Sequence, residues 1–243
     1  QGIKENLTWS VGMSVQIIGC ELRSFGDAMR ELDGKGMLRS DFILMNFDTI
    51  TNAKLLPSIM KQHKENCKRD KDTAMTVVYK RVAPGQRTGN EVIIATDQHN
   101  RLHFYQRIHP TIKEVKFKFP VDIFLNNPEV VIHHDLLDPQ ISICSINAHP
   151  LFSDNLDYES RDQFIRGVVM GQEFQIGSIY AAELPNEHYA AKVSDWMAYH
   201  NVSQDIINRW VYPLVPDMGI CMLRQEYLFL KNNIYRNNVV KIG

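Results

Sequence analysis

Short apolar runs, which predict strands, alternate along the chain with stretches whose apolar residues recur at helical spacing. The expected strands are Val15–Ile18, Phe42–Phe47, Ala74–Arg81, a hairpin of Val92–Ile94 with Leu102–Tyr105, Val130–Ile132, Ile141–Cys144 and Ile179–Leu184. Helices are expected after Ser24, after Thr51 or Asn52, after Ser160 and after Ser203, and extended segments at 116–125 and 189–199. The pattern predicts an α/β domain with a mixed, mostly parallel sheet.

The most informative stretch runs from Asp135 to Val169 and combines a strand, an acidic loop and a helix. Ser160 is suited to cap the helix, and Gln163 three residues later completes a capping box. We expect Phe164 to lie on the buried face of this helix with Ile165, Val168 and Val169. Arg161, Asp162 and Arg166 are expected on the exposed face.

The loop from Ser153 to Glu159 carries two apolar side chains, Leu156 and Tyr158, among carboxylates. One interpretation is that both fold back onto the following helix. The other is an exposed recognition loop, because apolar anchors inside a polar rim are typical of protein interfaces. The sequence leaves both interpretations open.

The composition argues against nucleic-acid binding, membrane insertion and zinc binding. The chain has 243 residues and a formal net charge of −1, so it can build a sizeable core and has no basic excess that would indicate nucleic-acid binding. It has no signal peptide and no apolar run long enough for a membrane span. The four cysteines are widely separated, which argues against zinc and favours a reducing compartment. The first residue is Gln, as expected for a fragment.

Several uncommon short motifs follow one another in a fixed order: Asp135-Leu136-Leu137-Asp138, Ile141-Ser142-Ile143-Cys144, Asp157-Tyr158, Arg161-Asp162 and Phe164-Ile165-Arg166-Gly167. With these motifs the chain resembles the epsilon-subunit family of eukaryotic translation initiation factor 2B. The resemblance extends from about Ile17 to Gly243. The resemblance implies a Rossmann-like nucleotidyltransferase fold over residues 1–216, with its opening strand and glycine loop missing. It also implies a linker and the first turn of a left-handed β-helix over residues 217–243.

The resemblance places a vestigial nucleotide-binding site at Ser24, Gly26, Asp27 and Asp48. Asp48 corresponds to the aspartate that holds magnesium in active nucleotidyltransferases. Phe47 stands where those enzymes have glycine, so we expect its ring to crowd the site. The chain also lacks a glycine-rich triphosphate loop, so a degenerate site without catalytic residues, cofactor or metal is expected. The alternative is an active sugar-nucleotide pyrophosphorylase that uses magnesium.

The family's complex is the guanine-nucleotide exchange factor for the GTPase initiation factor 2. The resemblance implies docking of that GTPase through Asn155 and Leu156, where the family has Asn-Phe, with Asp157 and Tyr158 contributing. It further implies pairing with other subunits, especially gamma, in the cytoplasm. Exchange itself belongs to a C-terminal helical-repeat domain that this chain does not contain. The alternative is a pure assembly scaffold without contact to the GTPase.

Overall fold

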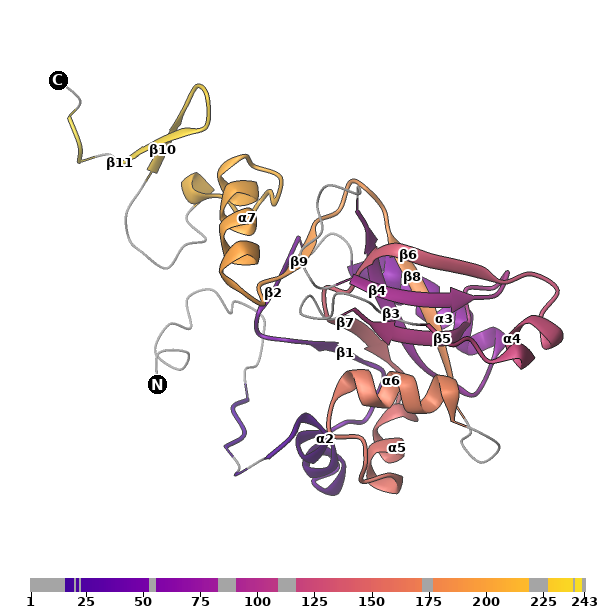
Figure 1. The fold of residues 1–243 in the computed structure, drawn as a ribbon. Helices are drawn as coiled ribbons and strands as arrows, with labels where there is room; N and C mark the ends of the chain where they lie inside the picture. Colours follow the sequence, from indigo (N-terminus) through magenta and orange to yellow (C-terminus); the bar gives the residue numbers. More distant parts are fainter. Residues whose placement is uncertain are drawn as a thin grey trace.

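The computed structural model describes residues 16–19, 21, 23–52, 56–82, 91–108, 117–171, 177–218, 227–237 and 239–241. Its centre is a curled seven-stranded sheet in the order β1-β7-β3-β6-β4-β5, with β8 paired to β3 (Figure 1). The strands are β1 (Phe42–Met45), β3 (Thr73–Arg81), β4 (Glu91–Thr96), β5 (Leu102–Arg107), β6 (Val131–Leu137), β7 (Ile141–Cys144) and β8 (Ser178–Leu184).

The α/β class is confirmed, but the prediction of a mostly parallel sheet is wrong. Every pairing in the sheet is antiparallel except that of β3 with β8. The reason lies in β3 and β7, which are covered on both faces, so that Thr73–Tyr79 and all of Ile141–Cys144 are buried. A strand covered on both faces reads as a continuous apolar run in either direction, so burial does not reveal direction.

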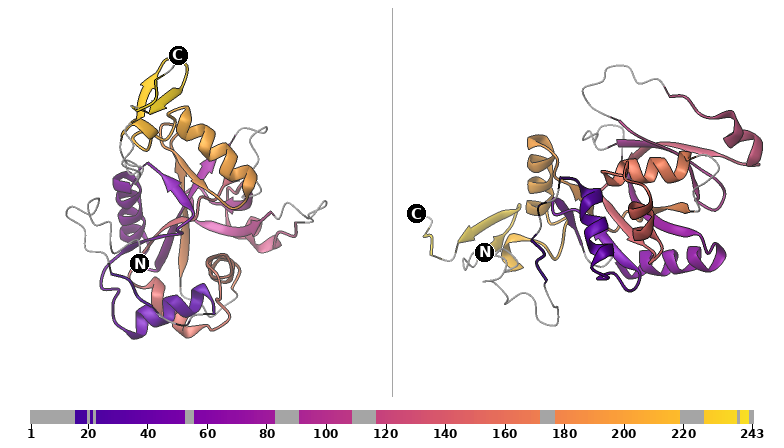
Figure 2. Two further views of the ribbon diagram at one scale, coloured as in Figure 1. Left: turned by 90° about the vertical axis from the view of Figure 1, so that its left-hand side faces the viewer. Right: turned by 90° about the horizontal axis from the view of Figure 1, so that it is seen from below.

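The described helices are α2 (Phe25–Gly34), α3 (Leu56–Arg69), α4 (Val121–Asn126), α5 (Ala148–Asp154), α6 (Arg161–Met170) and α7 (Trp196–Ile207), with a short 3-10 helix, η3 (Pro216–Met218). Helices α2, α5 and α6 pack on one face of the sheet and α3 packs on the other. Met29, Phe152 and Phe164 from α2, α5 and α6 form one core with Met75 of β3. Ile59 of α3 packs with Val78 of β3 on the opposite face, and the left view of Figure 2 shows α3 and α6 flanking the sheet.

Two further sheets have two strands each. β2 (Thr49–Thr51) pairs antiparallel with β9 (Ala190–Lys192). β10 (Tyr227–Leu230) and β11 (Ile234–Asn237) form an antiparallel hairpin beyond α7 (Figure 1). A β-helix stacks parallel strands. The described part of 217–243 therefore does not show the expected first turn of a left-handed β-helix.

Three local expectations are corrected. Gln16–Gly19 belong to no strand, and 121–126 form α4 instead of extended chain, with Pro120 directly before the first helical residue. Asp195 is the N-cap of α7, since its side chain accepts from the Ala198 N–H, and Ser203 lies inside the helix. Val15, the loop 84–90 and Ile242–Gly243 lie outside the described residues. No helix among the described residues is both long enough and apolar enough to span a membrane.

Candidate functional site

The loop Asn155–Glu159 joins α5 to α6 and is fixed at both ends. The Asn155 Oδ1 accepts from the Asp157 N–H at 2.9 Å, which closes an Asx turn. At the other end the predicted capping box is confirmed: the Gln163 N–H donates to the Ser160 Oγ at 3.2 Å, and the Ser160 N–H donates to the Gln163 Oε1 at 2.8 Å. The turn is therefore held by its own hydrogen bonds before any partner binds.

Tyr158 lies beneath the loop. The expectation that its side chain is exposed on the loop is therefore wrong. Its side chain is 4% exposed and meets Phe152 and Phe164 edge to face, with ring centroids 6.1 and 5.4 Å apart. The ring also lies on Gly167, where an added Cβ would come within 2.3 Å of the Tyr158 Cε1. The interpretation that the apolar side chains fold back onto the helix holds for Tyr158.

Leu156 behaves in the opposite way, because its side chain is 71% exposed. Asp154, Asp157 and Glu159 around it are also exposed, and Asn155 is half-buried. One apolar side chain thus projects from a rigid turn inside a rim of carboxylates. This is the arrangement that the recognition-loop interpretation expects.

Ser24, Gly26 and Asp27 lie beside this loop, at the start of α2. The Ser24 Oγ accepts from the Asp27 N–H at 3.1 Å, and the Gly26 N–H donates to the Glu159 carbonyl oxygen at 3.1 Å. Arg30 forms an ion pair with Asp27 at 2.9 Å and holds the pKa of that carboxyl below its ordinary value. These residues support the loop between α5 and α6.

Asp48 lies elsewhere, directly before β2, and Figure 1 shows β2 near α7 and away from α2. Its Oδ2 is 3.9 Å from the Lys192 Nζ, and its carbonyl oxygen accepts from the Val193 N–H. Phe47, which we expected to crowd this site, is fully exposed to solvent. The structure therefore does not bring the four proposed nucleotide-binding residues together.

A cleft of about 620 Å³ lies near Asp48, between the end of β3, the β6–β7 turn and α7. Its wall includes Lys80 and Lys192. The Lys80 Nζ is 4.6 Å from the centre of the Tyr189 ring. Burial lowers the pKa of Lys80, although Asp205 acts in the other direction. Among the described residues no group of three or more His, Cys, Asp or Glu side chains is arranged to hold a metal ion.

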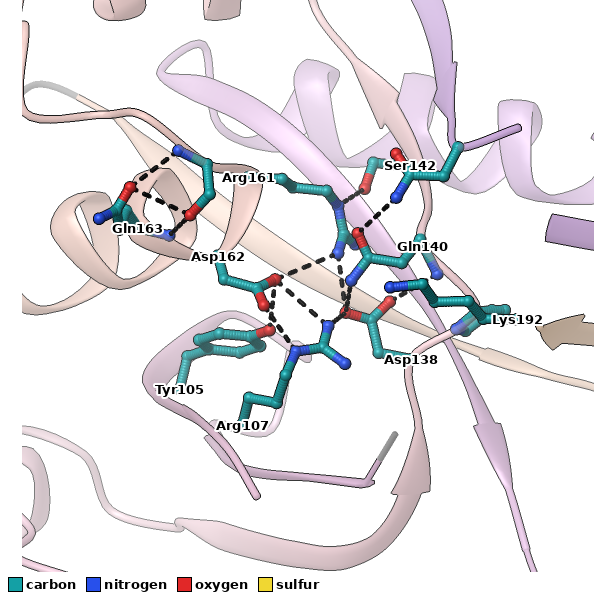
Figure 3. Close-up of polar contacts among 12 residues, drawn as sticks. Tyr105, Arg107, Asp138, Gln140, Ser142, Arg161, Asp162, Gln163 and Lys192 are labelled. Carbon is teal, nitrogen blue, oxygen red and sulfur yellow. Dashed lines mark hydrogen bonds and ion pairs between the residues drawn. The ribbon is translucent and has the colours of Figure 1, made fainter. Parts of the chain in front are cut away.

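Sequence reasoning missed a buried charge network behind the loop (Figure 3). The Asp138 Oδ2 is 2.8 Å from the Arg107 Nη2 and 2.7 Å from the Arg161 Nη1. Asp162 accepts from the Arg107 Nε at 2.6 Å and from the Tyr105 hydroxyl at 2.8 Å. Arg161, predicted on the exposed face of α6, is only 5% exposed.

The network contains two arginines and two aspartates, so its formal charges cancel inside the protein. Burial acts to raise the pKa of Asp162, but hydrogen bonds and charge from Arg107 outweigh it and the pKa is lowered. Because Arg107 ends β5, Asp138 begins the β6–β7 turn and Arg161 starts α6, the network ties the loop-bearing helix to the sheet. These residues are far apart in sequence, and no spacing signals their contact.

A comparison with models of known protein families finds no match. Two curated relatives bear the name translation initiation factor eIF2B subunit epsilon. The one from Schizosaccharomyces pombe is 32% identical over 231 residues, 93% of this chain. The one from Dictyostelium discoideum is 33% identical over 242 residues, 96% of this chain. The chain spans about a third (33%) of the length of each relative.

Among solved structures, the inositol-1-phosphate CTP transferase from T. maritima matches with a TM-score of 0.55 and 8% identity, over 88% of this chain and 74% of that chain. At this identity the match concerns the fold, which is that of a nucleotidyltransferase. The sequence matches span 93% and 96% of this chain, and the fold match spans 88%. Over most of its length the chain is therefore similar to eIF2B epsilon subunits, and its fold is nucleotidyltransferase-like.

Proposed function

We propose that this chain is the part of a guanine-nucleotide exchange factor subunit that docks the GTPase initiation factor 2 during translation initiation in the cytoplasm. The similarity to eIF2B epsilon subunits supports the complex, and the loop Asn155–Glu159 supports the docking role. The observation that carries the proposal is Leu156, an exposed apolar side chain on a turn that is fixed by hydrogen bonds. A preformed turn loses little conformational entropy on binding.

Within this proposal the docking residues have separate roles. Leu156 is the anchor, Asp157 belongs to the charged rim, Asn155 shapes the turn and Tyr158 supports it from below. An exchange factor shifts its GTPase towards the nucleotide-free state only through different affinities for the two states. We assign this chain attachment to the GTPase and little exchange activity of its own.

We also propose that the nucleotidyltransferase site is degenerate. The contact of the Asp48 Oδ2 with the Lys192 Nζ at 3.9 Å favours this view, because a cation from the chain itself lies beside the carboxylate. The cleft of about 620 Å³ beside Lys80 and Lys192 favours the alternative, an active sugar-nucleotide pyrophosphorylase. Pyrophosphate release from a nucleoside triphosphate and a sugar phosphate, assayed with magnesium, decides between them.

The domain boundary near residue 216 is part of the same proposal, with 217–243 leading into a β-helix and with gamma as one partner subunit. The support for a boundary is that β10 and β11 pair only with each other among the described strands. Pro213 and Pro216 precede them and favour the end of a compact unit.

The test is a pull-down of purified GDP-bound initiation factor 2 by the 243-residue chain. Asn155→Ala with Leu156→Asp is expected to weaken binding by about tenfold or more, because an anchor is replaced by a charge. Leu125→Asp on α4 is the matched control, since Leu125 is 75% exposed and lies outside the loop. Equal binding of both variants would contradict docking and favour the pure scaffold.

A further inference from the structure

The loop is too small to be a complete docking surface. Stable protein interfaces bury about 800 Å² on each partner, from roughly 20–30 residues a side. Asn155–Glu159 supplies five residues, of which Tyr158 is buried. An interface centred on Leu156 must therefore continue onto a neighbouring surface.

A shallow groove of about 410 Å³ adjoins the loop. The loop contributes Asp157 and Tyr158, and successive turns of α6 contribute Gln163, Arg166, Gly167 and Met170, which Gly171 follows as the C-cap. Gly167 keeps the groove open, because a Cβ there would collide with the Tyr158 ring and displace it. The same ring therefore supports the loop and forms the floor of the groove.

The groove has opposite charges at its edges and an apolar floor. Arg166 and Asp157 are both exposed, and neither forms an ion pair with another described residue. Between them lie Met170, which is half-buried, and the Tyr158 ring, which is almost fully buried. A complementary segment would offer a carboxylate to Arg166, an apolar side chain to Met170 and a cation to Asp157.

We propose that this groove is the second half of the docking surface, and that it takes a segment of the GTPase with an acidic side chain beside Arg166. The inference rests on the proposed docking function and deepens it. It assigns Arg166 and Met170, on α6, to partner recognition together with Leu156. Two observations support the inference: the groove is continuous with the loop, and its edges carry the opposite charges of Arg166 and Asp157.

The test measures the dissociation constant between the 243-residue chain and GDP-bound initiation factor 2 by biolayer interferometry. Arg166→Glu is expected to weaken binding by about tenfold, and Arg166→Ala by less, because reversal adds repulsion to the lost pair. Lys64→Glu on α3 makes the same change in net charge on the other face of the sheet and should stay within about twofold.

Circular dichroism checks that each variant is folded, and the exposed position of Arg166 makes loss of the fold unexpected. If Leu156→Asp weakens binding but Arg166→Glu binds like the parent chain, the groove inference is overturned while the docking function stands. If neither variant weakens binding, docking fails, and the inference fails with it.

Discussion

At the scale of single residues, two glycines fix the position of the docking loop. A Cβ on Gly26 would lie 1.8 Å from the Tyr158 carbonyl oxygen, and a Cβ on Gly167 would lie 2.3 Å from the Tyr158 Cε1. The first obstacle is backbone, so it cannot rotate away. Tyr158 is therefore held between α2 and α6 because both helices lack a side chain where they meet it.

Gly26→Ala is expected to lower the free energy of unfolding by about 1–3 kcal/mol, because α2 must separate from the loop. Gly34→Ala is the control in the same helix, since nothing lies within 4 Å of its added Cβ. That change should be neutral or stabilising by up to about 1 kcal/mol. Urea unfolding measures both, and equal effects would contradict the close packing described here.

Asp138→Asn tests the buried network. The substitution leaves Arg107 and Arg161 without the carboxylate that both contact, and about 3–5 kcal/mol of unfolding free energy should be lost. Glu31→Gln breaks the exposed pair with Lys35 at 2.7 Å and should cost no more than about 0.5 kcal/mol. Denaturant titrations of the two variants give the comparison, and a small effect at Asp138 would show that the network does not stabilise the fold.

At the scale of elements, the sequence predicts a local structure correctly where the interacting residues are close in sequence. Ser160 and Gln163 are three residues apart, and the helix start they predict is confirmed. Asp195 and Ser203 are both able to cap a helix, and the pattern favoured the wrong one. In the structure the Ser203 hydroxyl donates to the Tyr199 carbonyl oxygen inside α7.

Features that depend on distant partners were not readable. Leu156 and Tyr158 look alike in sequence, and only the positions of Phe152, Phe164 and Gly167 decide that Tyr158 is the buried one. Gly167, a small residue inside a helix, was the one available signal. The hairpin of β4 with β5 follows the sequence pattern.

Helix α3 contributes a pH-dependent element of stability through His63, whose Nδ1 is 2.8 Å from the Thr76 Oγ1. Burial lowers the pKa of His63 below 6.5, although Asp41 acts in the other direction. The unfolded chain therefore binds the proton first. The stabilisation from neutral His63 is present when the pH is above the pKa that His63 has in the unfolded chain. It is lost as the pH falls through the pKa that His63 has in the folded chain.

The free energy of unfolding should accordingly decrease between pH 7 and pH 5. His63→Gln should flatten this dependence, whatever its effect at pH 7, whereas His99→Gln at an exposed position should keep it. His133 also has a pKa lowered by burial, so a residual slope is expected. Denaturant unfolding at several pH values checks the slopes, and an unchanged slope in His63→Gln would contradict the assignment.

At the scale of the whole molecule, helices pack on both faces of the sheet, and β1 lies at one of its edges. β1 pairs only with β7 among the described strands, and Ile43 and Met45 on it are partly exposed. Open apolar edge strands favour pairing between molecules.

The chain should therefore form larger species as its concentration rises. Ile43→Lys should reduce them because a charge at the edge opposes strand pairing, and Leu125→Lys on α4 should not. Light scattering after size-exclusion chromatography compares the variants. Identical profiles for all three chains would show that β1 is not the contact.

The burial of Asp138 and Arg161 changes how dissolved salt acts on the charges of this protein. Dissolved ions screen exposed charges over about 8 Å at physiological concentration but reach buried pairs much less. Asp157 and Arg166 are exposed, whereas Asp138 and Arg161 are buried. Added salt should therefore release a charged partner from the loop and groove long before it loosens the helix that carries them.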